Sequence, residues 1–258
     1  MKVVLFCGGL GLRLRDFSDS IPKPLAPIGP QPILWNVMRY YAHYGHKDFI
    51  LCLGHRGEAI RRFFLEYKEA MTNDFTMTNG GTKIDLHKSD IHDWKITVVD
   101  TGLRSNIGER LMKVRKYLEG EEVFLANYSD GLTDLPLDQY VDYALEHDKV
   151  ACFVSVKPAT SFHVVQSASD GTVTDIAPSS ENMRINCGYF VLKQEIFDYM
   201  EPGEELVLAP FHRLIAENQL VTYDYDGFWE CMDTFKDKQQ LDDMYARGDA
   251  PWEVWKSE

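Results

Sequence analysis

The amino-acid sequence predicts an α/β fold in which helices cover both faces of a mostly parallel sheet. Two observations carry this prediction. Short apolar runs of strand length alternate with amphipathic segments of helical length through the first half of the chain. In addition, 258 residues with 45% hydrophobic content suffice for one large core. Because such sheets bind ligands at the carboxyl ends of their strands, functional residues are expected there.

The elements of the first half follow in order. The apolar run 2–7 stops at Gly8-Gly9, as a buried strand that ends in a turn would. Residues 32–45 have apolar positions at helical spacing, with Pro32 in the first turn and Gly45 at the end. Further strands are expected at 48–54, 94–100, 122–127 and 150–156, and further helices at 57–71, 107–119 and 136–147.

The second half has a different texture. Residues 162–191 predict short antiparallel strands, with Asp170-Gly171 as a hairpin turn. Residues 72–92 are polar and weakly periodic, which indicates a long excursion from the body. No linker or repeat divides the chain, so we expect a single domain over 1–258. The remaining helices are expected near 207–218 and 234–247.

Composition excludes several classes of protein. Lys and Arg number 27 against 40 Asp and Glu, and this net charge of −13 argues against a nucleic-acid polymer as partner. No apolar run approaches the roughly 18 residues of a spanning helix, so no membrane partner is expected. The five cysteines are widely spaced without a C-x-x-C pair, which favours a reduced, cytoplasmic protein.

A glycine-rich turn follows the first predicted strand. The backbone N–H groups of Gly8, Gly9 and Gly11 could cradle phosphate oxygens beside Arg13. A Walker loop is excluded because the chain has no Gly-Lys pair, and a dinucleotide fingerprint because Leu14 stands where a third glycine belongs. A tight turn with a surface arginine is an equally good reading of this turn alone.

Three further side chains could carry chemistry. Lys23 lies between two prolines, which suits a positioned cation for a phosphate as well as a rigid, solvated loop. Asp130 follows the strand 122–127 and could hold Mg²⁺, or form an ordinary Asp-Gly turn. Asp233 could complete a metal site, while Asp233-Thr234 could equally cap the final helix.

Together these motifs resemble the nucleoside-diphosphate-sugar pyrophosphorylases, and most closely the glucose-1-phosphate cytidylyltransferase family. The resemblance rests on GGLGLRL, PKP, the DG after a strand and WECMDT. It extends over the whole chain through KDFILCLGHRGEAI, NIGERL, INCGYFVL and APWEVW. It implies a Rossmann-like nucleotidyltransferase sheet with a small antiparallel sugar-binding portion. It also implies Mg²⁺-dependent nucleotidyl transfer, in which a sugar 1-phosphate attacks the α-phosphorus of a nucleoside triphosphate and pyrophosphate leaves.

The resemblance assigns roles to the candidates. Residues 1–156 would form the nucleotide-binding part, and residues 157–258 the acceptor-binding part with the C-terminal helix. The implied catalytic residues are Arg13 at the β- and γ-phosphates, Lys23 at the α-phosphate, and Asp130. The implied metal ligands are Asp130 and Asp233. The implied nucleotide contacts are Gly8, Gly9, Gly11, Arg13, Lys23 and Arg110, and the acceptor contacts are Thr101, Asn186 and Tyr189.

The sequence departs from the family mainly at the acceptor end. Residues 175–181 contain no lysine where family members carry Glu-Lys-Pro, and Arg184 is nearby but shifted. We expect CTP as the donor and glucose 1-phosphate as the family-default acceptor. A different phosphorylated or phosphonate acceptor and a catalytically silent nucleotide-binding paralogue are the alternatives, the altered acceptor being favoured over the silent paralogue. The pair Trp252 and Trp255 predicts a packed tail, against this chain or another subunit of a homo-oligomer.

Overall fold

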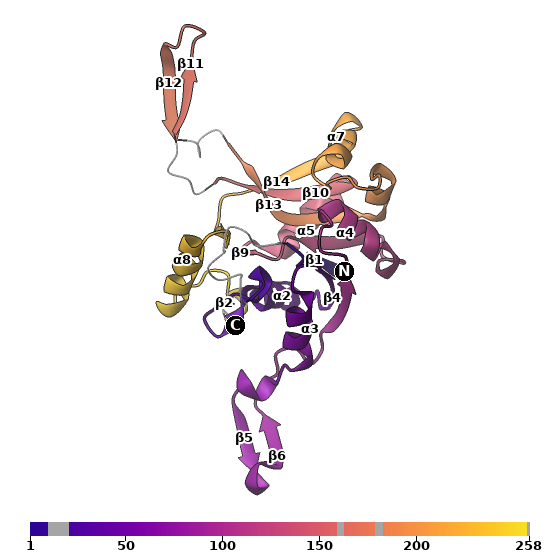
Figure 1. The fold of residues 1–258 in the computed structure, drawn as a ribbon, viewed down its shortest axis with the longest axis vertical. Helices are drawn as coiled ribbons and strands as arrows, with labels where there is room; N and C mark the ends of the chain where they lie inside the picture. The colour runs from indigo at the N-terminus through magenta and orange to yellow at the C-terminus, as the bar shows by residue number, and fades with distance from the viewer. Residues whose placement is uncertain (10–20, 159–162, 179–182, 257–258) are drawn as a thin grey trace.

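A computed structural model describes residues 1–9, 21–158, 163–178 and 183–256. Its centre is a seven-stranded sheet in the order β14-β10-β13-β8-β1-β4-β7 (Figure 1). Only β13 runs against the others, pairing antiparallel with both β8 and β10, so the predicted mostly parallel sheet is confirmed. The strands are β1 (Lys2–Phe6), β4 (Asp48–Leu53), β7 (Lys95–Asp100), β8 (Val123–Asn127), β10 (Ala151–Val156), β13 (Ile185–Lys193) and β14 (Leu220–Tyr225).

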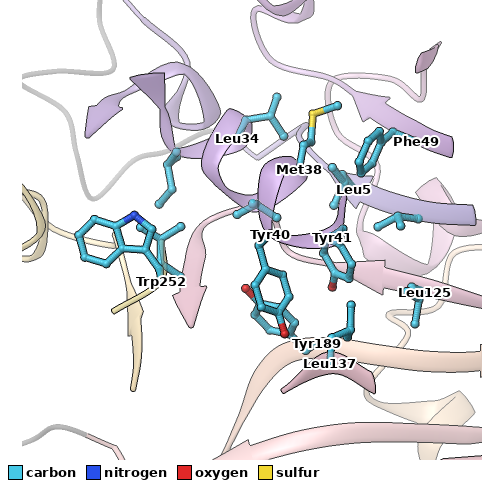
Figure 2. Packing of buried hydrophobic residues seen from close by; sticks show 14 of the residues in the cluster. Leu5, Leu34, Met38, Tyr40, Tyr41, Phe49, Leu125, Leu137, Tyr189 and Trp252 are labelled. Carbon is cyan, nitrogen blue, oxygen red and sulfur yellow. The ribbon is translucent and has the colours of Figure 1, made fainter. Parts of the chain in front are cut away.

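Helices cover both faces because successive strand residues point to opposite sides. Val3 and Leu5 of β1 belong to one buried cluster, which includes residues of α2 and α5, while Val4 and Phe6 belong to a second, which includes residues of α4 and α7. Figure 2 shows the first cluster, in which Met38 lies close to Leu5. The helices are α2 (Ile33–His43), α3 (Gly57–Leu65), α4 (Ile107–Val114), α5 (Leu137–His147), α7 (Ala209–Ala216) and α8 (Phe235–Ala246).

Short elements complete the fold. The two-stranded pairs are β2 (Pro27–Ile28) with β3 (Gln31–Pro32), β5 (Phe75–Thr78) with β6 (Lys83–Leu86), β9 (Gly131–Thr133) with β15 (Trp229–Cys231), and β11 (His163–Ser167) with β12 (Val173–Pro178). The 3-10 turns are η2 (Lys23–Leu25), η3 (Glu69–Met71), η4 (Asn79–Gly81), η5 (Arg115–Tyr117), η6 (Gln194–Tyr199) and η7 (Val254–Lys256). None of the helices in the described ranges has the length and apolar content needed to cross a membrane.

Three expectations about individual elements need correction. The helix expected at 57–71 ends at Leu65, because the chain must turn for the Glu69 carboxylate to accept hydrogen bonds from the backbone N–H groups of Asp90 and Ile91. The helix expected at 107–119 ends at Val114 and continues as a 3-10 turn. Of the strands expected within 162–191, the last is a nine-residue member of the central sheet rather than a short hairpin strand.

Two hairpins project from opposite ends of the molecule, β5–β6 and β11–β12 (Figure 1). The excursion at 72–92 and the hairpin turn at Asp170-Gly171 are therefore confirmed. The C-terminal segment packs against its own chain: Trp252 is 1% exposed and its ring stacks on Phe228 at 5.8 Å, while Trp255 meets the edge of Trp35. The predicted packing of the tail is confirmed on this chain.

Candidate active site

A cavity of about 450 Å³ opens at the carboxyl ends of β1 and β8. This is the end of a parallel sheet at which ligands bind, because the strand-to-helix turns place polar groups there. Its walls combine both halves of the chain. The lining residues are Phe6, Gly9, Lys23, Pro24, Ser105, Asn106, Ile107, Arg110, Tyr128, Ser129, Asp130, Glu205 and Asp233.

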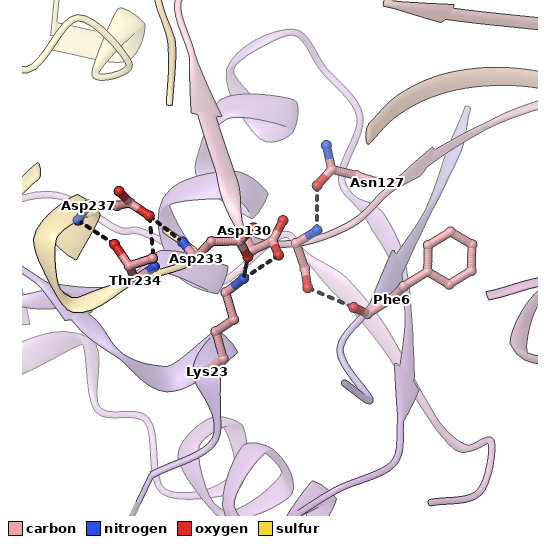
Figure 3. A network of polar contacts seen from close by, with 8 residues as sticks. Phe6, Lys23, Asn127, Asp130, Asp233, Thr234 and Asp237 are labelled. Carbon is pink, nitrogen blue, oxygen red and sulfur yellow. Dashed lines mark hydrogen bonds and ion pairs between the residues drawn. The ribbon is translucent and has the colours of Figure 1, made fainter. Parts of the chain in front are cut away.

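Lys23 bridges two carboxylates at one end of this cavity. Its ammonium Nζ lies 2.6 Å from Asp130 Oδ2 and 2.6 Å from Asp233 Oδ1 (Figure 3). Pro22 precedes it with φ −65° and Pro24 follows it, so the backbone of the lysine is stiff. The lysine side chain is 13% exposed, against 27% for Asp130 and 36% for Asp233. The sequence-derived candidates at these three positions are thus neighbours in space.

Backbone pairing brings the two aspartates together. Asp130 follows β8 and precedes β9, and Gly131 of β9 pairs with Cys231 of β15. The N–H of Met232 then donates to the carbonyl of Asp130 at 2.9 Å. This small antiparallel pair sets Asp233 beside Asp130.

Two hydrogen bonds of Ser129 stabilise the turn that precedes Asp130. Ser129 has φ +65°, a left-handed conformation that needs local support in a non-glycine residue. Its N–H donates to Asn127 Oδ1 at 2.6 Å and its Oγ donates to the Phe6 carbonyl at 2.9 Å (Figure 3). The strained turn therefore ties the ends of β8 and β1 together and directs Asp130 into the cavity.

Helix α8 is capped by the residue after Asp233. Thr234 Oγ1 accepts from the Asp237 N–H at 3.2 Å, and Asp237 Oδ2 accepts from the N–H groups of Asp233 and Thr234. In this capping box, Thr234 and Asp237 satisfy backbone N–H groups at the N-terminus of α8. The Asp233 side chain is consequently directed to Lys23 rather than used as the cap.

The local electrostatics favour a cation between the aspartates. Burial acts most strongly on Lys23 and favours its neutral amine, yet the two carboxylates outweigh burial and raise its pKa. Burial also raises the pKa of Asp130, against the opposing effect of Lys23. Removal of the positive charge would therefore leave two carboxylates in a poorly solvated place.

The donor set suits a metal that is completed by substrate. Among the described residues, no group of three or more His, Cys, Asp or Glu could hold a metal ion. Asp130 and Asp233 nevertheless converge on one point, and a cationic group already stands there. Mg²⁺ is typically bound through one or two carboxylates together with substrate phosphates, so the two aspartates fit it.

Arg110 lies beneath the glycine turn. It is 3% exposed, and its two terminal nitrogens donate to the carbonyls of Gly8, Leu53 and Gly102 and to Thr101 Oγ1 at 2.7–3.1 Å. Burial lowers its pKa. A Cβ on Gly8 would lie 2.1 Å from Arg110 Nη1, so this glycine is required by the close approach of the guanidinium. Arg110 thereby joins the carboxyl ends of β1, β4 and β7 and also lines the cavity.

The three acceptor candidates are not part of the cavity lining. Thr101 is fully buried, and its Oγ1 donates to the Leu53 carbonyl at 2.7 Å. Tyr189 is 1% exposed and its hydroxyl donates to the Gly131 carbonyl at 2.8 Å. Both therefore support the site from within, and direct contact of either with an acceptor is not supported. Asn186 Nδ2 donates to the hydroxyl of Tyr128, a lining residue, at 3.4 Å, and the role of Asn186 stays a prediction.

Other candidates have different outcomes. Gly11 and Arg13 lie outside the described residues, so their predicted roles stay predictions. Arg184, considered as a replacement for the family lysine, lies 2.7 Å from Asp226 and 3.3 Å from Asp224 and is engaged away from the cavity.

Sequence reasoning missed several lining residues. Asn106 had a usable signal, since N-x-x-E before a helix predicts the capping box that it forms with Glu109. Tyr128 begins the segment Tyr128-Ser129-Asp130-Gly131 after the strand 122–127, but no local pattern predicts that its side chain lines the cavity. Glu205 had no sequence signal, because the turn that carries it reaches the cavity only through tertiary packing.

Similarity to known proteins extends over nearly the whole chain. Residues 2–237 match the family described as nucleotidyl transferase. The chain is 34% identical over 258 residues to the glucose-1-phosphate cytidylyltransferase of Salmonella typhimurium strain LT2, covering 99% of this chain and 100% of the relative. It is 33% identical over 257 residues to a probable glucose-1-phosphate cytidylyltransferase of Bacillus subtilis, again with 99% and 100% coverage.

Solved structures support the same fold. A UDP-glucose pyrophosphorylase complexed with UDP-glucose superposes with a TM-score of 0.70 at 15% identity, covering 96% of this chain and 98% of that one. A putative glucose-1-phosphate thymidylyltransferase from Bacillus anthracis gives 0.68 at 16% identity, with 95% and 94% coverage. At such identities the likeness concerns the fold alone. From the family match and the full-length relatives, the chain belongs to the nucleotidyl transferase family.

Proposed function

We propose that this protein transfers the cytidylyl group of CTP to glucose 1-phosphate and releases pyrophosphate. The observation that carries the proposal is the Lys23 ammonium held between Asp130 and Asp233 at the carboxyl ends of the strands. It occurs in a chain that is 34% identical over its full length to a glucose-1-phosphate cytidylyltransferase.

The residue chemistry suits an in-line displacement at phosphorus. Catalysis of this kind consists mostly of positioning and charge neutralisation. Mg²⁺, held by Asp130 and Asp233 when bound, would supply charge neutralisation on the triphosphate. Lys23 remains cationic because its pKa is raised, so it can neutralise charge on the α-phosphate oxygens. Arg13 is proposed to hold the phosphates that leave as pyrophosphate.

Pyrophosphate release tests this assignment. With CTP, glucose 1-phosphate and Mg²⁺, Asp130→Asn and Lys23→Met should each lower kcat by about 10²–10³-fold, as expected for loss of a preorganised charged group. Asp226→Asn is the matched control, because this exposed carboxylate pairs with Arg184 away from the cavity. Near-normal turnover in both site variants, or equal losses in the control, would contradict the assignment.

The acceptor should be identified with a panel of sugar 1-phosphates and other phosphorylated or phosphonate compounds. Arg184 is engaged by Asp224 and Asp226, so no replacement for the family lysine is evident among the described residues. This favours a different phosphorylated or phosphonate acceptor as the second candidate. Transfer to such an acceptor, with little to glucose 1-phosphate, would establish it. Triphosphate binding without pyrophosphate release across the panel would instead indicate a silent paralogue.

We further propose a homo-oligomer in the cytoplasm. On the β5–β6 hairpin the cross-strand pairs Phe75–Leu86 and Met77–Ile84 form one apolar face, with side chains 39–60% exposed. A projecting apolar face of this kind is typical of an interaction site. Light scattering of the wild type and of a Met77→Ser/Ile84→Ser double variant tests it, with loss of association expected in the variant. All five cysteines are free, which supports a reducing compartment.

A further inference from the structure

A second polar cluster also lines this cavity, and Glu205 is its acidic member. Glu205 lies in the turn between η6 and α7, at the start of α4. Its Oε2 accepts from the Ile107 N–H at 3.4 Å and its Oε1 accepts from the Leu206 N–H at 3.0 Å. The same turn is fixed by Asn106, whose Nδ2 donates to the Gly203 carbonyl at 2.9 Å.

The turn and the helix meet at backbone distance. A Cβ on Gly108 would lie 2.2 Å from the Glu204 carbonyl oxygen, so only glycine permits this packing. Glu204 in turn forms an ion pair with Arg213 of α7 at 2.6 Å. Glu205 is therefore carried by a rigid support, which is what a selective contact requires.

The Glu205 carboxylate can still accept further hydrogen bonds. Both bonds that it receives from the described residues come from backbone N–H groups, whereas a carboxylate offers about four acceptor sites. A carboxylate in a cavity wall attracts N–H and O–H donors and repels phosphate oxygens and carbonyl groups.

Tyr128 lies near both polar clusters. Its ring packs between Phe6 and Phe190, with centroids at 6.4 and 5.2 Å. Tyr128 lines the same cavity as Asp130 and Glu205. A nucleotide whose phosphates lie at Lys23 would thus run along an aromatic wall, and its nucleoside would approach the carboxylate.

We propose that Glu205 is a specificity-determining residue that accepts a hydrogen bond from the exocyclic amino group of cytosine. The inference rests on the proposed cytidylyl transfer. Cytosine presents an N4 amino donor, and a glutamate is a suitable acceptor for it. Uracil and thymine present a carbonyl acceptor at the same position, which cannot donate to a carboxylate oxygen. Glu205 would therefore select CTP over UTP and dTTP.

Glu205→Gln tests this reading with little change in shape. The Gln carbonyl can still accept from the Ile107 N–H, while its amide nitrogen can donate to the O4 of uracil. The experiment measures kcat/KM for CTP, UTP and GTP with glucose 1-phosphate, together with calorimetric dissociation constants of CDP and UDP without turnover. We expect the CTP/UTP ratio to fall at least tenfold, mainly through KM, and the CDP/UDP affinity ratio to fall in parallel.

Glu217→Gln provides the matched control. Glu217 is exposed and accepts from the Tyr199 hydroxyl at 2.6 Å, so its variant should keep the wild-type ratios. Equal losses for CTP and UTP in Glu205→Gln would indicate a ribose contact and overturn the proposal, as would a change only in KM for glucose 1-phosphate. Failure of the wild type to turn over any triphosphate would contradict the proposed function, while the CDP/UDP affinities would still decide the role of Glu205.

Discussion

Replacing Lys23 by methionine removes the cation between Asp130 and Asp233 but keeps most of the apolar stem. In the folded protein the ammonium lies 2.6 Å from each carboxylate. Removal of one partner from a fully buried ion pair costs about 3–5 kcal/mol, because the remaining charge is left uncompensated. The three side chains are 13%, 27% and 36% exposed, so water screens part of this cost. We expect a loss of about 2 kcal/mol, which lowers Tm by about 4–8 °C in a domain of this size.

Magnesium should act more strongly on this variant than on the wild type. Without the ammonium, a divalent ion no longer competes with Lys23 for the two carboxylates, and its binding to the folded state stabilises that state by mass action. In the wild type, Mg²⁺ without nucleotide must compete with Lys23. Differential scanning calorimetry in EDTA and in millimolar Mg²⁺ measures both effects. The expected result is a larger Mg²⁺-induced rise in Tm for Lys23→Met than for the wild type.

Lys157→Met is the control for loss of a surface cation. Lys157 lies 3.5 Å from the exposed Asp226, and such a pair contributes about 0–1 kcal/mol. A Tm of Lys23→Met within about 1 °C of the wild type in EDTA, well short of the expected shift, would contradict a stabilising role of the ammonium. Equal Mg²⁺ shifts in the two proteins would refute the competition between metal and ammonium.

Three further changes test the scaffold. Gly8→Ala should lower the free energy of unfolding by about 1–3 kcal/mol in urea titrations, because its Cβ would lie 2.1 Å from the pinned Arg110 guanidinium. His46→Gln should flatten the stability–pH profile between pH 6.5 and 4. Burial lowers the pKa of His46 from 6.5 to about 4, so the unfolded chain takes up a proton that the folded protein excludes, and wild-type stability falls as pH decreases through that window. The full difference corresponds to about 3 kcal/mol, and solvent screening of the partly exposed ring reduces the expected component to about 2 kcal/mol. Trp252→Ala should cost about 3–5 kcal/mol, because the ring is 1% exposed.

Each of these changes has a matched control. No described atom lies within 4 Å of a Cβ built on Gly9, so Gly9→Ala should leave stability within about 0.5 kcal/mol. His87 is exposed, and His87→Gln should keep the wild-type pH profile. Phe235 is 60% exposed, and Phe235→Ala should cost far less than Trp252→Ala. If a control variant lost as much stability as its test variant, or changed the pH profile equally, the contact proposed for the test residue would not explain the effect.

Local pattern was sufficient for most of the fold. Apolar runs such as 2–7 and 48–54 form buried strands, as expected because they are too short for a typical helix and contain no polar face. The stiffness of Lys23 between two prolines was likewise a local property and could be read directly. The ends of helices were less predictable. Helix α3 stops at Leu65, and Glu69 beyond it accepts hydrogen bonds from the backbone N–H groups of Asp90 and Ile91. This contact lies about twenty residues away in the chain, so the local sequence does not reveal it.

The alternation of strands and helices, the candidate charged residues and the family resemblance can all be read from local sequence. Which charged side chains meet depends on the tertiary fold. Asp130 and Asp233 are distant in the chain, and the pairing of β9 with β15 brings them to one lysine. The same level of structure placed Thr101 inside the scaffold and Glu205 in the cavity wall. The physical reason is that periodicity reports only which face of an element is buried, whereas the partner across a cavity depends on strand register and backbone approach between distant segments.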